Sequence, residues 1–180
     1  MGYISKVNLV SALKKVIANT TANNIKLAYH GTPRSKFDVL KLEQKPTSKQ
    51  IYGNGLYFTS KKRAAESFAT GRYGVIFTVD LSNLRIWDAE HDLKTAKILA
   101  NKLGVTLPIK LFLDGWHTLM VNKDTNLLGD AKQKMMIETL LQLGFDGIDV
   151  LFQSDEHWYI IYKNIDKIKY IKKEVKQRKE

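Results

Sequence analysis

The segment Tyr73–Asp80 constrains the fold of this chain more than any other part of its sequence. Val75, Phe77 and Val79 occupy every second position of this segment. A period of two residues with β-branched and aromatic side chains is typical of a strand that packs one face against a core. The fold must therefore include a sheet to which this segment belongs.

Short strand-like patterns alternate with helical ones along the rest of the chain. Further strands are predicted at residues 25–29, 55–59, 147–152 and 158–162, and helices near 7–17, 61–69, 89–103, 111–121 and 132–143. His30-Gly31-Thr32-Pro33 is expected to form a turn after the first strand. Ser60 is expected to cap the helix at 61–69, and Gly144 to end the last helix. We therefore expect an α+β protein with helices inserted among the strands of an antiparallel-type sheet.

One domain over residues 1–180 is the expected organisation, because the chain has neither an internal repeat nor a Pro- or Gly-rich linker. The helices predicted between residues 88 and 143 form an insert among the strands. Basic side chains crowd the C-terminal segment 167–180, which is expected to be frayed or a short exposed helix. The chain contains no cysteine, which excludes disulfides, zinc–thiolate sites and a thiol nucleophile.

The charge of the chain is strongly positive. Lys and Arg number 29 against 18 acidic residues, which gives a formal net charge of +11. A field of this sign attracts polyanions such as nucleic acid, although a solvated lysine-rich surface explains the same number equally well. No apolar run approaches the length of a membrane span, and the N-terminus lacks a signal-peptide core. We therefore expect no membrane partner and a cytoplasmic location, in the producing or the target cell.

Four sequence features carry the functional interpretation. His30-Gly31-Thr32 follows the first predicted strand, Gly55-Leu56-Tyr57-Phe58 lies on the next, and Phe68 stands eleven residues after Tyr57. With Asp155-Glu156 before the last strand, this pattern resembles the ADP-ribosyltransferase superfamily, in the His–Tyr–Glu branch shared by diphtheria-type toxins and poly(ADP-ribose) polymerases. It is most similar to short phage-borne members, which also have a strand like Gly144-Phe145-Asp146-Gly147. The resemblance covers roughly residues 25–80 and 140–170 and implies a split antiparallel β-sheet core.

The resemblance implies that NAD⁺ is bound as a co-substrate, without a metal. Tyr57 and Phe68 would then stack on the two faces of the nicotinamide ring. The backbone of Gly31 would approach the carboxamide, and His30 would bond ribose hydroxyls. Arg34 is a candidate partner of the diphosphate, and Thr32 and Gly55 complete the implied NAD⁺ site. Each of these residues also has a simpler explanation, because a lone histidine at a strand end is usually structural and strand and helix aromatics usually pack in a core.

The catalytic carboxylate is the point where the sequence departs from the family. In the polymerase-like members a glutamate immediately precedes an aromatic strand, and Trp158 stands at that position here. Glu156 lies two residues earlier, so on a continuing strand it shares the face of Trp158. Asp155 is the next candidate, and both acids are otherwise explained as solvated turn residues. Ala65 stands where the polymerases have a serine that contacts the carboxamide, so that contact is expected to be missing.

The function that the resemblance implies is mono-ADP-ribosyl transfer from NAD⁺ to a macromolecule, by a toxin, a defence factor or a phage effector. The positive charge slightly favours a nucleic acid over a protein side chain as acceptor, and a toxin would imply an antitoxin or immunity partner. Three alternatives stay open. They are an NAD⁺ glycohydrolase that uses water as acceptor, a nucleic-acid-binding module, and a fold that binds NAD⁺ without turning it over.

Overall fold

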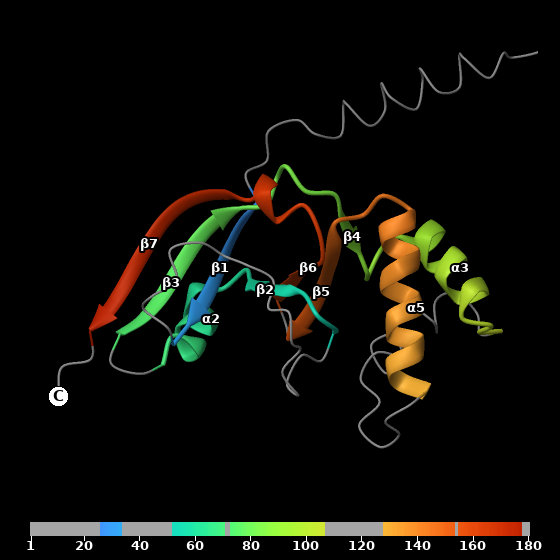
Figure 1. Ribbon diagram of the computed structural model, residues 1–180, viewed down its shortest axis with the longest axis horizontal. Coiled ribbons are helices and arrows are strands. Elements are labelled where there is room, and N and C mark those ends of the chain that lie inside the picture. Colours follow the sequence, from blue (N-terminus) through green and yellow to red (C-terminus); the bar gives the residue numbers. More distant parts are fainter. Residues whose placement is uncertain (1–25, 34–51, 71–72, 107–127, 154, 178–180) are drawn as a thin grey trace, which may run out of the picture.

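The computed structural model of the protein describes residues 26–33, 52–70, 73–106, 128–153 and 155–177 (Figure 1). Its strands are β1 (Leu27–Thr32), β2 (Leu56–Thr59), β3 (Tyr73–Asp80), β4 (Ile86–Asp88), β5 (Gly147–Gln153), β6 (Glu156–Ile161) and β7 (Lys169–Gln177). Its helices are α2 (Lys62–Phe68), α3 (Leu93–Lys102), α5 (Leu128–Gln142) and the short 3-10 helix η1 (Ile165–Lys167). The expected α+β class is confirmed. The helices predicted at 7–17 and 111–121 lie outside the described residues.

The strands form one seven-stranded mixed sheet in the order β4-β5-β6-β2-β1-β3-β7. All neighbouring strands are antiparallel except β4 and β5, which run parallel. Parallel neighbours need a crossover connection, and here the chain passes through α3 and α5 between them. Figure 1 shows these two helices side by side at the β4 end of the sheet. The sheet is therefore not antiparallel throughout, because the helical insert acts as a crossover.

The sheet is weakly joined at its centre. β1 pairs with β3 along its whole length, from Leu27 to Thr32, and β2 pairs with β6 along its whole length. Within the described residues, β1 and β2 pair only at Tyr29 and Thr59. The sheet thus consists of two well-paired halves, β4-β5-β6-β2 and β1-β3-β7, that separate beyond this pair.

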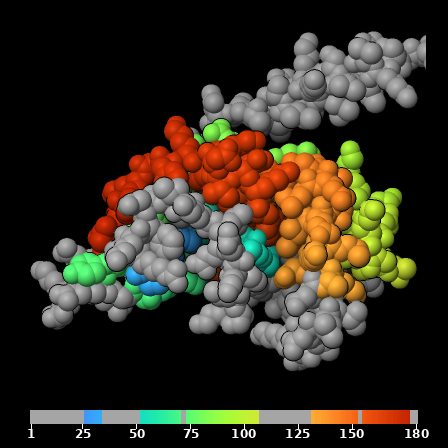
Figure 2. All heavy atoms as spheres, in the orientation of Figure 1, coloured from blue at the N-terminus to red at the C-terminus, as the bar shows by residue number. Residues whose placement is uncertain are grey.

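Apolar cores lie on both faces of the sheet. On one face, β5 and β6 pack under α3 and α5, and this core contains Trp87, Leu99, Met136, Leu140, Ile148 and Ile160. On the other face the two halves of the sheet share a core that contains Phe58, Val75, Phe77, Val79, Tyr159 and Ile161. Successive side chains of a strand point to opposite faces, which explains why Tyr159 and Ile160 belong to different cores. In the space-filling view, the C-terminal strands and α5 lie next to each other across one side of the molecule (Figure 2).

Helix α2 packs directly on the backbone of β1 and β3. A Cβ added at Gly31 would lie 1.8 Å from the carbonyl oxygen of Ala65, and one added at Gly74 would lie 2.1 Å from that of Ala69. Both contacts are with backbone, which cannot move aside as a flexible side chain does. Glycine is therefore required at these two positions for α2 to approach the sheet.

Two local predictions near the first two strands are wrong. His30-Gly31-Thr32 belongs to β1 and does not form a turn, because these residues pair with Phe77, Ile76 and Val75 of β3. Ser60 does not cap α2, which begins after Lys61 without a side-chain cap. The Ser60 hydroxyl instead accepts a hydrogen bond from His157 N.

The prediction of a frayed or helical C-terminal segment is also wrong. Residues 169–177 form β7, which pairs with β3 from Tyr73 to Asp80. The sequence hides this strand because β7 is an edge strand with little buried surface, and Ile171 and Val175 are half exposed. Without a buried face the strand has no apolar alternation. The strand is instead stabilised by backbone hydrogen bonds to β3, which the apolar pattern of the sequence does not indicate.

Candidate functional site

Tyr57, on β2, contributes an aromatic ring to the candidate site, and its hydroxyl is hydrogen-bonded to the protein backbone. The hydroxyl accepts a hydrogen bond from Tyr52 N at 2.9 Å and donates one to the carbonyl oxygen of Gly53 at 2.9 Å. The ring packs against the core under α3 and α5, and its burial raises the pKa of the hydroxyl well above the ordinary value. Tyr57 is therefore fitted to act through its ring and not as an acid or base.

Phe68 belongs to an exposed cluster of three aromatic rings at the end of α2. Its ring is 51% exposed and meets the ring of Trp158 edge-on, with the centroids 6.1 Å apart. Phe152 stacks on the other side of this cluster, 4.3 Å from Trp158 at an interplanar angle of 17°. Among the described residues, the ring that Phe68 contacts is that of Trp158 and not that of Tyr57, although Tyr57 and Trp158 pack against the same core. The sequence did not indicate Trp158 or Phe152 as stacking residues.

Glu156, at the start of β6, is hydrogen-bonded to Trp158 of this cluster. Its Oε1 accepts a hydrogen bond from Trp158 Nε1 at 2.5 Å and another from the Thr59 hydroxyl at 3.2 Å. Thr59 and Trp158 are directly opposite each other in the β2–β6 ladder, which brings both donors to one carboxylate. Both donors are neutral. Within the described residues, no cation lies at ion-pair distance from Glu156.

Asp155 is placed differently, although it is the next residue along the chain. Its side chain is 80% exposed and forms an ion pair with Lys61. The Lys61 ammonium donates a hydrogen bond to the carboxylate and lowers the pKa of Asp155 below its ordinary value. The charge of Asp155 is thus already compensated by a lysine, whereas that of Glu156 is not.

His30 sits where the two halves of the sheet separate. Its Nδ1 lies 2.7 Å from the carbonyl oxygen of Tyr57. A carbonyl only accepts, so Nδ1 carries the hydrogen and, in the neutral ring, Nε2 is an acceptor. The ring lies 5.7 Å from that of Phe58 and 6.3 Å from that of Phe77, on the face of the sheet opposite to Tyr57 and Glu156. His30 is therefore tied to the backbone of Tyr57 but does not share a face with its ring.

The other predicted site residues have mainly structural surroundings. Gly31 is covered by the backbone of α2, and Thr32 is buried at the end of β1. Gly55 lies against β6, where an added Cβ would be 2.4 Å from a methyl carbon of Ile160. Arg34 lies outside the described residues.

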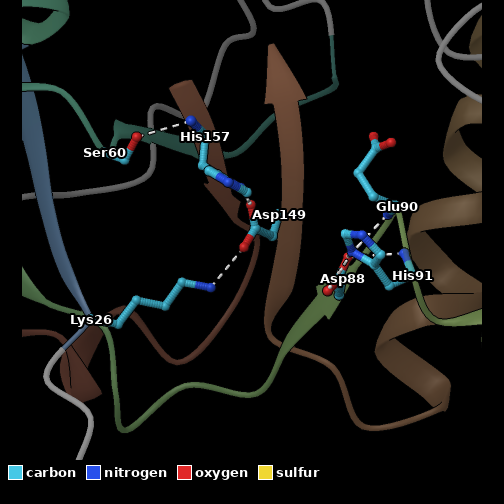
Figure 3. A network of polar contacts seen from close by, with 7 residues as sticks. All are labelled: Lys26, Ser60, Asp88, Glu90, His91, Asp149 and His157. Atoms are coloured by element: carbon cyan, nitrogen blue, oxygen red, sulfur yellow. Dashed lines mark hydrogen bonds and ion pairs between the residues drawn. The ribbon is translucent and has the colours of Figure 1, made fainter. Parts of the chain in front are cut away.

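The start of β6 is fixed by a polar network that the sequence did not indicate (Figure 3). Ser60 N donates to the carbonyl oxygen of His157 at 2.8 Å, and His157 N donates to the Ser60 hydroxyl at 2.9 Å. The His157 ring and the Lys26 ammonium each contact Asp149, on its two oxygens, at 2.8 Å. Since His157 adjoins Glu156 in the chain, this network holds the backbone from which Glu156 projects.

In the part of the chain that the structure describes, no group of three or more histidine or acidic side chains is arranged to hold a metal ion. No helix in that part is long and apolar enough to cross a membrane.

Comparison with known protein families finds no match, and no curated protein matches the chain. Among solved structures, one described as the crystal structure of an anti-CRISPR protein is similar with a TM-score of 0.40 and 13% sequence identity. The similarity covers 83% of this chain and 93% of that one. A likeness at this level carries no argument about the function of the present chain.

Proposed function

We propose that the protein is a mono-ADP-ribosyltransferase that cleaves NAD⁺ between nicotinamide and ribose and transfers ADP-ribose to a macromolecule. The bond between C1′ and the nicotinamide nitrogen breaks, nicotinamide leaves as a neutral molecule, and an acceptor nucleophile bonds to C1′ and loses its proton. Positive charge develops on the ribose as the bond breaks. The site must therefore supply a fixed negative charge next to a surface that holds an aromatic ring.

The observation that carries this proposal is the environment of Glu156. Its carboxylate is held by two neutral donors, at 2.5 and 3.2 Å, beside the partly buried ring of Trp158, which the exposed ring of Phe68 contacts. A carboxylate whose donors are both neutral leaves its negative charge uncompensated by a cation, and the ring of Phe68, with that of Tyr57 on the same face of the sheet, offers a surface on which nicotinamide can stack. Glu156 is accordingly the catalytic residue in this proposal, and Asp155, paired with Lys61, is not.

The strand order supports the same assignment. β1, β2 and β6 are neighbours in the sheet, so His30, Tyr57 and Glu156 come from adjacent strands, with Tyr57 and Glu156 on one face and His30 on the other. The sheet separates between β1 and β2 beyond Tyr29, which agrees with the split core of that superfamily. Of the residues that the resemblance assigns to the NAD⁺ site, Gly31 is one with weak support, because α2 covers its Cα and leaves only its backbone groups to contact a carboxamide.

As acceptor we propose a nucleic acid, on the basis of the net charge of +11. Part of the C-terminal positive charge is compensated inside the protein, since Lys172 contacts Glu174 and Lys176 contacts Glu66. Transfer that depends on phosphate contacts should fall steeply between about 50 and 200 mM salt. The contribution of the C-terminal lysines to acceptor binding cannot be tested by deleting residues 169–177, because the deletion would remove strand β7 from the sheet.

The experiment is incubation of the protein with NAD⁺ labelled in its adenylate part, with and without a cell lysate. The expected result is a label on macromolecules that nuclease removes and protease does not, and that Glu156→Gln abolishes. A label removed only by protease makes a protein the acceptor. Nicotinamide release that is unaffected by lysate, without a labelled macromolecule, makes the protein an NAD⁺ glycohydrolase. If the wild-type protein releases no nicotinamide under any condition, the proposed function is wrong.

A further inference from the structure

We propose that Trp158 is a positioning residue that fixes which oxygen of Glu156 faces the substrate. The inference rests on the proposed function, because it assigns a role within the same site. Trp158 stands at the position where the polymerase-like members of the superfamily that the sequence resembles have their glutamate, and its indole N–H donates a hydrogen bond to the carboxylate two residues earlier. The tryptophan therefore supports the displaced glutamate.

The indole N–H has a direction that is set by packing. Glu156 and Trp158 lie at alternate positions of β6, so both side chains project from one face. The indole is stacked on Phe152 at 4.3 Å and touched edge-on by Phe68 at 6.1 Å. Rotation of the indole would break both ring contacts. The donor that reaches Glu156 at 2.5 Å is thus held by two neighbours that do not touch the carboxylate themselves.

The second donor is oriented in a similar way. The Thr59 hydroxyl accepts a hydrogen bond from Lys61 N at 3.1 Å, which leaves its own hydrogen to point at Glu156. Both donors bond to Oε1 of Glu156, and among the described residues none donates to Oε2. Oε2 is therefore the oxygen presented to the ribose. A carboxylate that is fixed before the substrate binds needs no reorganisation in the transition state.

The contact itself is tested by the indole N–H signals in a ¹H–¹⁵N NMR spectrum. The chain contains three tryptophans, and Trp158→Phe identifies the signal of Trp158 by its loss. Glu156→Gln replaces a charged acceptor with a neutral one, so this signal should move upfield. Asp155→Asn is the matched control, because it changes the adjacent acid and should leave the signal in place. A signal that does not respond to Glu156→Gln would overturn the positioning role, whether or not the protein is active.

The consequence for the reaction is tested by the kinetics of nicotinamide release. Trp158→Phe keeps an aromatic ring against Phe152 and removes the N–H, so kcat should fall about tenfold to 100-fold while KM for NAD⁺ changes little. Thr59→Val removes the other donor and should cause a smaller loss of kcat; it serves as the second test if Trp158→Phe fails to fold. A rise in KM with unchanged kcat in a folded variant would show that Trp158 only binds substrate, which overturns the proposal. A wild-type protein without turnover would instead overturn the proposed function. The NMR experiment does not depend on turnover, so it still shows whether the hydrogen bond between Trp158 and Glu156 is present.

Discussion

The β5–β6 hairpin carries one carboxylate on each face of the sheet, Asp149 on β5 and Glu156 on β6, and the two are held by opposite means. On one face, Glu156 accepts hydrogen bonds from two neutral donors, the Trp158 indole and the Thr59 hydroxyl. On the other face, Asp149 is bonded to the Lys26 ammonium and to the His157 ring, which carries a charge when protonated. Among the described residues, the first carboxylate has no cationic partner. The second is compensated within the protein and serves to hold the β5–β6 hairpin against the N-terminal end of β1.

This difference shows how one hairpin can carry a carboxylate that stabilises the fold on one face and a carboxylate that is available to a ligand on the other. A carboxylate that stabilises a developing cation loses its effect if a lysine is already bound to it. A partly buried carboxylate that serves the fold gains from such a partner, because desolvation of an unpaired charge is costly. The alternation of β6 keeps the two environments on opposite faces of the sheet although His157 and Glu156 are adjacent in the chain.

The largest expected effect is that of Glu156→Gln, which keeps the shape of the side chain and removes its charge. Nicotinamide release should fall by about 10²–10³-fold or more, while NAD⁺ binding is largely preserved. Asp155→Asn is the matched control and should change the rate little, because Lys61 already compensates that acid. The measurement is the rate of nicotinamide release at saturating NAD⁺. A larger loss for Asp155→Asn would reverse the assignment of the two acids.

A smaller loss is expected in NAD⁺ affinity when the ring of Tyr57 is removed. Tyr57→Ala should weaken binding by about 0.5–1.5 kcal/mol beyond the loss of buried area, because a stacking face disappears. Tyr57→Phe keeps the ring and should bind NAD⁺ nearly as well as the wild type, since the hydroxyl is engaged by backbone groups of Tyr52 and Gly53. Calorimetric titration of both variants with NAD⁺ decides the matter. Equal losses for the two variants would show that the hydroxyl, and not the ring, binds the substrate.

On the opposite face, Asp149→Asn should affect stability and leave the chemistry intact. The variant leaves Lys26 and His157 without their charged partner, and the free energy of unfolding should fall by about 1–3 kcal/mol. The rate of nicotinamide release per folded molecule should stay close to that of the wild type. Urea unfolding and kinetics on the same preparation test both halves of this prediction. A variant of normal stability with a large loss of kcat would abolish the distinction between the two faces.

The smallest effect concerns alkaline pH and is independent of both carboxylates. Burial raises the pKa of Tyr57 and of Tyr162 above the ordinary value of 10.0, so the folded state favours their neutral forms. This stabilisation is complete below pH 10.0, and it is lost as the pH rises toward the folded pKa, because the unfolded chain releases these protons first. Unfolding midpoints in urea between pH 8 and pH 11 should therefore decline above pH 10 in the wild type. The decline should be smaller in Tyr57→Phe, and a midpoint independent of pH would refute the assignment.

The sequence predicted best those elements whose faces are buried. The strand Tyr73–Asp80 is confirmed at both ends, because Val75, Phe77 and Val79 are fully buried on one face. Gly144 ends the last helix as expected, with a positive φ of 85° that favours glycine. β4 and β7 were not predicted, since β4 has three residues and β7 lies at an exposed edge of the sheet.

For the candidate site, the sequence by itself determined the chemical groups and their faces. The alternation of side chains along β6 requires that Glu156 and Trp158 share a face. The absence of a side chain at Gly31 permits the close approach of α2. Only the tertiary structure decided which acid is paired with a lysine. Lys61 lies 94 residues from Asp155 along the chain, and Thr59 lies 97 residues from Glu156. Pairings over such separations depend on the register between β2 and β6, which no local pattern records, because the energy that fixes it comes from cores on both faces of the whole sheet.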